Sequence, residues 1–405
     1  MGSRSKRNNK NKRRTDIFKL SIIMALILVL AAGAVIILMK QSGSTSSIPQ
    51  GAGKNTGTTA EPEKTPPPKQ AESTPEAGVP ETPAKKDTNV LLSAVGDCTI
   101  GTDTKFNQST SLPVVVQKHD NDLSYLFSNV SSIFKNDNIT IANLETTFTN
   151  SSSRRDKNAE VQYSFKGDPE LAKSLVLGSV EAVNVSNNHI YDFGDEGFKD
   201  TLDTLKAENV AYFGEGNQWV TEVNGVTFGF LGYQGWSADS SFLKKLKNDI
   251  TALKTKASVV VVTFHWGVER SYTPNDVQQK LAHYAVDCGA DLIIGHHPHV
   301  VQGIEKYKDR FICYSLGNFC FGGNSNPSDK DTFIFQADFK FQDKKLNSIG
   351  VKAIPCRISS VSSYNDYRPT PMTGDNKSKL LKKLNGLSTN IGFEISDNFN
   401  YSAVK

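Results

Sequence analysis

The chain has 405 residues, of which 38% are hydrophobic and 22% are charged. This composition excludes a polytopic membrane protein and a wholly disordered chain, and the length allows two or three domains. The net charge of +4 is uneven, because residues 1–40 carry a net +8 and residues 41–405 therefore carry −4. A main body without excess positive charge gives no electrostatic support for binding nucleic acid.

An uncharged apolar run covers Leu20–Met39, and eight basic residues precede it. A helix of this length crosses ~30 Å of hydrocarbon. The positive-inside rule therefore predicts a basic cytoplasmic head over residues 1–19, a single-pass anchor over 20–39 in the cell membrane and an extracellular C-terminal body. A cleaved signal peptide, with the small residues Ala32–Ala34 at the cleavage site, is the alternative.

Residues 40–88 are expected to form a disordered stalk. Eight of the chain's 16 prolines lie within residues 41–88, which contain no aromatic residue. Such a segment buries too little apolar surface to offset the entropy lost on ordering. The body then covers residues 89–365, and residues 366–405 follow as a polar C-terminal extension with one short helix at 377–384.

Expected strands and helices alternate through the body, and strands alone follow after residue 300. This order predicts an α/β fold with at least one mixed sheet. The expected strands are residues 89–95, 139–144, 180–185, 226–231, 258–264, 291–294, 311–315, 332–341 and 348–354. The expected helices are residues 123–134, 169–177, 197–208, 242–256 and 277–288.

Five of these strands end in polar residues, and the carboxyl ends of strands form the ligand crevice of open α/β sheets. Carboxylates with neutral imidazoles are a ligand set for Zn, Mn or Fe, and two bridged ions can stabilise a phosphoryl displacement. We therefore expect one metal site from Asp97, Glu145, Asn187–His189, His265 and His296–His299. The other two histidines, His119 and His283, are expected to be structural or solvent-facing.

The five cysteines are Cys98, Cys288, Cys313, Cys320 and Cys356, without CxxC spacing. They are expected to be small buried side chains, and one disulfide is the alternative.

The polar strand ends lie in six motifs that together resemble the CapA family of poly-γ-glutamate capsule proteins, within the calcineurin-like metallophosphoesterase superfamily. The resemblance spans roughly residues 90–323. It implies a four-layer α/β/β/α metallophosphoesterase-like sandwich with a two-metal site between its sheets, preceded by a transmembrane helix and a stalk. The motifs are Val95–Asp97, Ala142–Glu145, Ser186–Gly194, His265–Glu269, Gly295–Gln302 and Ser315–Phe319.

The resemblance also implies roles for individual residues. Asp97 matches the ligand of metal one, Glu145 the bridging carboxylate, and Asn188 and His265 the ligands of metal two. His189 matches the acid that assists the leaving group. The final pair, His297 and His299, supplies one ligand to each metal, and His296 is an additional residue that could replace one of them.

One position departs from the superfamily, which places a histidine two residues after the first aspartate. Here that residue is Thr99. Metal one therefore lacks a ligand unless Cys98, His296 or a water replaces it, although a packed Cys98 thiol is the simpler interpretation.

Four further residues each have a functional and a structural interpretation. Asp192 could orient His189, or it could cap the following helix. Glu269 could be a metal ligand, a general base or a substrate contact, or else form a loop ion pair. Asn318 either lines the pocket or serves a turn, and Trp266 is either a pocket wall or part of the core.

The resemblance implies a membrane-anchored extracellular protein that takes part in poly-γ-glutamate capsule biosynthesis or export. Its expected partners are that polymer or another envelope polymer and the membrane subunits that make or export it, and its expected cofactors are one or two divalent metal ions. Arg154 and Arg155 could form a local basic patch for a polyanion. The alternative is a metal-dependent envelope hydrolase, a phosphoesterase acting on another substrate with His189 as general acid.

Overall fold

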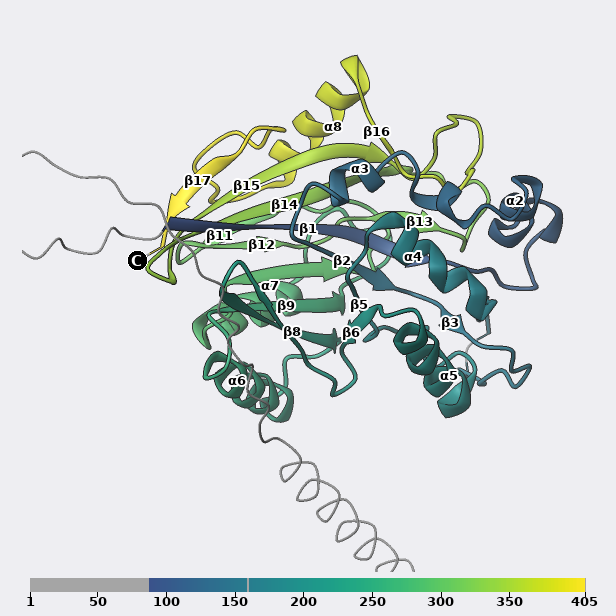
Figure 1. The fold of residues 1–405 in the computed structure, drawn as a ribbon, viewed down its shortest axis with the longest axis horizontal. Coiled ribbons are helices and arrows are strands. Elements are labelled where there is room, and N and C mark those ends of the chain that lie inside the picture. The colour runs from purple at the N-terminus through teal and green to yellow at the C-terminus, as the bar shows by residue number, and fades with distance from the viewer. Residues whose placement is uncertain (1–86, 159, 405) are drawn as a thin grey trace, which may run out of the picture. The chain divides into compact units, whose positions relative to one another are not determined.

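The computed structural model describes residues 87–158 and 160–404 (Figure 1). The expected head, the expected membrane anchor and residues 40–86 of the expected stalk lie outside this range. None of the helices in the described range is both long enough and apolar enough to cross a bilayer. The first strand begins at Asp87, so Asp87 and Thr88 belong to a sheet and not to the stalk.

The larger sheet is mixed. Its strands are β1 (Asp87–Thr99), β2 (Ile139–Leu144), β5 (Ala182–Asn184), β6 (Ala211–Phe213), β13 (Asn318–Phe321), β14 (Asp331–Gln342), β15 (Lys345–Arg357), β16 (Thr370–Pro371) and β17 (Asn400–Ala403). The order is β16-β15-β14-β1-β2-β5-β6, with β13 beside β1 and β17 beside β15. β1, β2, β5 and β6 run parallel, whereas β14 pairs with β1 in the antiparallel sense.

The second sheet contains β7 (Trp219–Val223), β8 (Val226–Gly235), β9 (Val259–Trp266), β10 (Leu292–His296), β11 (Ile304–Tyr307) and β12 (Arg310–Cys313). Its order is β11-β12-β10-β9-β8-β7, and β8, β9, β10 and β12 run parallel. β3 (Thr147–Phe148) and β4 (Lys166–Gly167) form a separate short pair. The parallel strands of each sheet present their carboxyl ends at one edge, which is where the site lies.

Helices lie on the outer faces of both sheets (Figure 1). The larger sheet packs against α2 (Leu112–Lys118), α3 (Ser131–Phe134), α4 (Lys173–Gly178), α5 (Gly194–Ala207) and the 3-10 helices η2 (Leu123–Phe127) and η3 (Pro169–Ala172). The second sheet packs against α6 (Ser240–Lys254) and α7 (Asp276–Asp287). The 3-10 helix η1 (Gln108–Thr110) and α8 (Gly374–Leu387) complete the helices of the described range.

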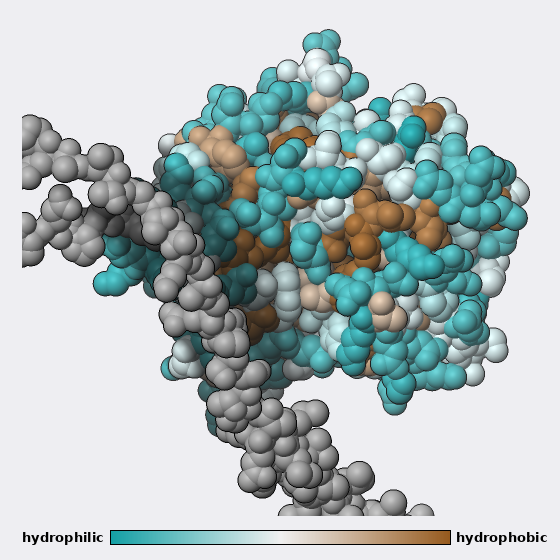
Figure 2. All heavy atoms as spheres, in the orientation of Figure 1, coloured by the Kyte–Doolittle hydropathy of each residue, from teal (hydrophilic) through white to brown (hydrophobic). Residues whose placement is uncertain are grey.

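The two sheets face each other across an apolar core. Alternate residues of one strand point to opposite faces. In β9, Val259 and Val261 therefore pack between the sheets, whereas Val260 and Val262 pack beneath α6 and α7. These layers bury most of the apolar side chains of the sheets. The face of the molecule seen in Figure 2 is therefore mainly hydrophilic, with smaller apolar patches.

Two segments differ from the sequence-based expectation. The helix expected at 123–134 is split into η2 and α3, and Asn129 between them donates its side-chain amide to Thr370 Oγ1 at 2.9 Å. The expected polar extension 366–405 instead adds β16 and β17 to β15. It also packs Leu380 and Leu384 of α8 against the core between the sheets, because their i, i+4 spacing places both on one helix face.

All five cysteines are free, so the alternative of a disulfide does not apply. Cys288 is half-buried and the others are buried, which confirms the expectation of small packed side chains.

Candidate metal centre

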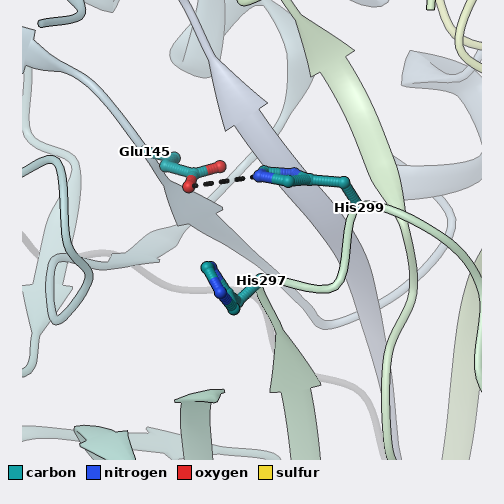
Figure 3. A group of neighbouring side chains, drawn as sticks. All are labelled: Glu145, His297 and His299. Carbon is teal, nitrogen blue, oxygen red and sulfur yellow. Dashed lines mark ion pairs between the residues drawn. The ribbon is translucent and has the colours of Figure 1, made fainter. Parts of the chain in front are cut away.

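Side chains from both sheets meet at the carboxyl ends of the parallel strands. Asp97 lies near the end of β1, Glu145 directly follows β2, and His265 and His296 lie at the ends of β9 and β10. The loop after β10 contributes His297 and His299, and Figure 3 shows both rings beside the Glu145 carboxylate. One ligand atom from each of Glu145, His297 and His299 lies within 4.8 Å of the other two.

Glu145 is fully buried, and neither of its carboxylate oxygens accepts a hydrogen bond from a described residue. Its Oε1 atom lies 3.5 Å from His265 Nε2, 3.9 Å from His299 Nε2 and 4.0 Å from His189 Nε2. Burial raises the pKa of Glu145 well above its usual value. A buried carboxylate without a donor is costly, and the surrounding imidazole nitrogens fit a shared cation.

Asp97 is equally buried but well partnered. Its Oδ1 accepts the Asn143 amide at 2.8 Å, and its Oδ2 accepts the backbone N–H of His297 at 3.2 Å. His299 Nδ1 lies 3.3 Å from Oδ2, and His296 Nδ1 lies 3.6 Å from Oδ1. Burial opposes ionisation, but the histidines and Asn143 hold the pKa of Asp97 below its usual value. Asp97 is therefore held as a carboxylate that could bind a cation.

The ring of His265 contacts two other residues expected at the site. Its Nε2 lies 2.7 Å from Asn188 Oδ1 and 3.1 Å from His297 Nδ1. Burial and the neighbouring imidazoles lower the pKa of His265 well below its usual value, and that of His297 to about 3. Both rings are therefore neutral, which is the protonation state that binds a metal ion.

His297 and His299 have positive φ angles, 96° and 58°, a conformation that non-glycine residues adopt only where the surrounding structure requires it. His299 Nδ1 lies 2.8 Å from Asn318 Oδ1, and Asn318 in turn donates its amide to the His299 carbonyl at 3.3 Å. These contacts direct the other ring nitrogen of His299 toward Glu145. Asn318 thus lines the pocket and orients the His299 ring at the start of β13, as the pocket interpretation expects.

Asp192 contacts His189 and does not cap a helix. Its Oδ2 lies 2.7 Å from His189 Nδ1, and helix α5 begins at Gly194 without a side-chain cap. Lys157, which the sequence did not indicate, forms an ion pair with Asp192 Oδ1 and lies 3.2 Å from His189 Nδ1. The Nε2 atom of His189 therefore faces Glu145 and the open side of the site.

Cys98 and His296 are the two side chains that could replace the histidine of the wider superfamily. Of these two, only His296 lies against Asp97. The Cys98 side chain points to the helix side of β1 and packs with Val95 and Ile100. Burial raises the pKa of its thiol to about 12, so Cys98 is not poised as a thiolate ligand. Thr99 Oγ1 is buried without a hydrogen-bond partner among the described residues.

A pocket of about 180 Å³ opens beside the candidate metal centre. His189, His299 and Asn318 line its inner end, and Glu269 lies in its wall. Glu269 makes no ion pair or hydrogen bond with a described residue, so the loop ion pair does not hold. Glu269 is not part of the cluster of Glu145, His297 and His299.

No role was predicted from the sequence for two further residues that matter to the site. Asn143, inside an apolar strand, bonds to Asp97 and lies 3.3 Å from His265 Nδ1. The exposed Trp236 stacks edge-on against His297 with ring centroids 4.8 Å apart. Trp266, in contrast, is fully buried and donates to the Tyr314 carbonyl at 2.9 Å, so it belongs to the core.

The two histidines expected outside the site lie elsewhere. The ring of His119 stacks on Tyr125 at 4.0 Å, and His283 Nε2 lies 3.0 Å from Glu305 Oε2.

Residues 91–323 match the family model described as bacterial capsule synthesis protein PGA_cap. The chain is 30% identical over 260 residues to the capsule biosynthesis protein CapA of Bacillus anthracis, covering 58% of this chain and 61% of the relative. It is 35% identical over 216 residues to the PGA biosynthesis protein CapA of Bacillus subtilis, covering 48% and 56%. The match therefore spans about three fifths of the length of these relatives.

Among solved structures, a 5′-nucleotidase from Candida albicans aligns with 65% of this chain and 51% of its own, at 10% identity and a TM-score of 0.37. This score is too low to bear on function.

Proposed function

Because the chain belongs to the bacterial capsule synthesis protein (PGA_cap) family, we propose that it takes part in the biosynthesis or export of poly-γ-glutamate. The observation that supports this most directly is that the family match, residues 91–323, contains every residue gathered at the candidate metal centre. Two relatives with at least 30% identity have names that refer to capsule or PGA biosynthesis.

The proposal includes a cellular location for the protein, which is anchored in the membrane with its body outside the cell. The apolar run at residues 20–39 would anchor the chain in the cell membrane with its basic N-terminus in the cytoplasm. The body would then lie outside the cell, where a polymer made at the membrane emerges. The partners we propose are poly-γ-glutamate and the membrane subunits that make or export it.

The residues at the centre fit a divalent cation. Glu145 has two buried oxygens without hydrogen bonds from described residues, and the imidazole nitrogens of His189, His265 and His299 lie within 4.0 Å of it. The residues that would hold one or two ions of Mn, Zn or Fe are Asp97, Glu145, Asn188, His265, His297 and His299, with His296 beside Asp97. When bound, such an ion supplies positive charge that polarises a carbonyl, carboxylate or phosphoryl oxygen.

The chain's own residues prepare the site in three ways. Asn318 and Asn143 fix the orientations of His299 and Asp97. Asp192 accepts the Nδ1–H of His189, and Lys157 pairs with the other Asp192 oxygen, which leaves Nε2 as the position where a proton can be held near the pocket. Burial of Glu145 and Asp97 excludes water and strengthens their interaction with a cationic or polarised group.

The test compares surface poly-γ-glutamate in the native host after deletion of the gene and after complementation with variants. We expect deletion to abolish surface polymer and His265→Ala to fail to restore it. Glu222→Gln, an exposed residue of β7 far from the ligand set, should restore it fully. Normal polymer in the deletion strain would falsify the proposal.

A metal-dependent envelope hydrolase is the second candidate. It is favoured by one specific observation, the contact of His189 with Asp192, because this arrangement suits a general acid. Purified protein with Mn²⁺ would then cleave a generic phosphodiester probe, and His189→Gln would lose that activity while retaining the metal. Cleavage unchanged in His189→Gln would contradict this function.

A further inference from the structure

An acid and a base at adjacent positions line the pocket without partners. Glu269 and Arg270 both lie in the wall of the pocket that reaches His189 and His299. Within the described part of the chain, neither side chain forms a hydrogen bond or an ion pair, with the other or with any third residue. Apart from the electrostatic effect of Glu269 on His299, the carboxylate and the guanidinium beside the candidate metal centre are therefore available to a ligand.

The backbone holds these two residues in place. Arg270 adopts a left-handed conformation with φ of 62°, and its N–H donates to the Pro298 carbonyl at 2.7 Å. Pro298 lies between His297 and His299, so this bond ties the Glu269–Arg270 segment to the loop that carries both histidines.

Aromatic rings line another part of the pocket wall. Phe106 stacks on Tyr163 with centroids 5.2 Å apart, and Tyr163 lies nearly parallel to Phe165, at 6.4 Å and 2°. Phe165 in turn lies 4.4 Å from the His189 ring. The rings thus lead from the exposed Tyr163 to the candidate metal centre and form an apolar part of the pocket wall.

We propose that this pocket binds the free amino end of a γ-linked glutamyl chain, with Arg270 on its α-carboxylate and Glu269 on its α-ammonium. A γ-linkage uses the side-chain carboxyl, so the first unit alone carries both an α-ammonium and an α-carboxylate on one carbon. Internal units lack the ammonium, and the first unit of an α-linked chain lacks the α-carboxylate. The inference rests on the proposed function, because it takes γ-linked glutamate as the ligand.

The chemistry of each contact is specific. A guanidinium forms two parallel hydrogen bonds with a carboxylate, and a carboxylate pairs with an ammonium group. The methylene groups and the amide plane of the glutamyl unit would lie against Phe165 and Tyr163. Because His189 and His299 line the same pocket, binding the amino end there brings the first γ-amide beside the metal centre.

The experiment measures binding by calorimetry with purified full-length protein and Mn²⁺. The probes are γ-linked tetraglutamate with a free amino end, its N-acetylated form and α-linked tetraglutamate. We expect the free γ-linked probe to bind about tenfold more tightly than either of the others. Glu269→Gln should remove the preference for the free γ-linked probe over the acetylated probe without lowering the affinity for the acetylated probe. Arg270→Gln should lower the affinity for the free γ-linked probe by about tenfold.

A matched control for Glu269→Gln is available on a distant strand. Glu222→Gln on β7 removes the same charge away from the pocket and should bind like the native protein. Arg270→Lys keeps the charge but loses the planar fork, and an intermediate affinity is expected. Thermal melting of each variant shows that a loss of binding does not come from unfolding.

Equal affinity of native protein for the free and acetylated γ-linked probes would overturn the inference, as would an undiminished preference in Glu269→Gln. If the deletion strain nevertheless lost its surface polymer, the proposed function would stand and only recognition of the amino end would fail. No binding of any glutamyl probe, together with normal surface polymer in the deletion strain, would overturn both.

Discussion

His189 Nδ1 lies 2.7 Å from Asp192 Oδ2, and the same carboxylate oxygen accepts the backbone N–H of Phe165 at 2.7 Å. Asp192 therefore connects His189 to the segment whose aromatic rings line the pocket. Lys157 pairs with the other oxygen, which keeps the buried carboxylate compensated. This arrangement orients the His189 ring and makes Asp192 a positioning residue.

The substitution Asp192→Asn should lower the pKa of His189 further. Burial already lowers this pKa, and the hydrogen bond and charge of Asp192 oppose that effect. The amide side chain of the variant would keep the shape of the carboxylate but remove the charge that favours the protonated ring. Imidazole NMR signals of metal-free protein, followed against pH, measure the shift. Asp195→Asn, in the first turn of α5, is the control, and an unchanged titration of His189 in D192N would contradict the proposed contact.

Glu145→Gln should have opposite effects on stability without and with metal. In metal-free protein the buried carboxylate accepts no hydrogen bond, so its neutral replacement should raise the free energy of unfolding by about 1–3 kcal/mol. In native protein with Mn²⁺ at a hundredfold excess over Kd, binding adds about 2.7 kcal/mol, which the variant should lose. Denaturant unfolding with and without chelator measures both. A lower free energy of unfolding in metal-free E145Q than in metal-free native protein would contradict this prediction, because it would show that Glu145 stabilises the fold.

Asn143→Leu should weaken both the fold and metal binding. Asn143 donates to Asp97 at 2.8 Å, and its carbonyl oxygen accepts the Asn184 amide at 2.9 Å. Leucine removes both bonds in a buried position, which should cost about 2–4 kcal/mol of unfolding free energy. Loss of the bond that orients Asp97 should reduce metal affinity by about 10–100-fold. Elemental analysis after dialysis gives the affinity change, and full metal retention would be the contrary result.

His296 should make metal-free protein less stable in acid. Burial lowers the pKa of His296 to about 4, whereas in the unfolded chain the pKa is near the usual 6.5. Between these values the unfolded state binds a proton that the folded state does not, so stability falls as pH falls. His296→Gln removes this loss of stability. The unfolding free energy of the variant minus that of native protein should therefore rise by at most about 1.4 kcal/mol for each pH unit as pH falls from 6.5 toward 4. Urea unfolding across this pH range tests it, and a pH-independent difference would contradict the buried neutral state of His296.

Much of the site could be predicted because its residues follow strands. Asp97, Glu145, His265 and His299 come at or just after the ends of strands that run parallel, and parallel strands in a βα series direct their carboxyl ends to one edge. The presence of Thr99 where the wider superfamily has a histidine was also visible, but the sequence left three replacements open. Only the structure places His296 at Asp97 and Cys98 in the core.

Residues whose partners lie far along the chain could not be predicted. Asn143 appears within an apolar strand, and its role depends on Asp97 and on Asn184, which are 46 and 41 residues away. Lys157 and Arg270 lie outside helices and strands, and long-range contacts to Asp192 and Pro298 fix their positions. The C-terminal strands could not be predicted for the same reason. The pairing of β17 with β15 depends on hydrogen bonds between residues that are about 50 positions apart in the chain.

The sequence by itself determined the alternation of strands and helices, the ligand types at the strand ends and the family, because periodicity and motifs are local properties of the chain. The tertiary structure decided which polar groups are buried without partners, which residues orient the ligands and which charges remain free in the pocket. Those properties depend on burial and on distances between segments far apart in sequence. Glu145 is a candidate metal ligand from its place after a strand, and the structure adds that its carboxylate is buried among four histidine rings without a hydrogen bond from a described residue.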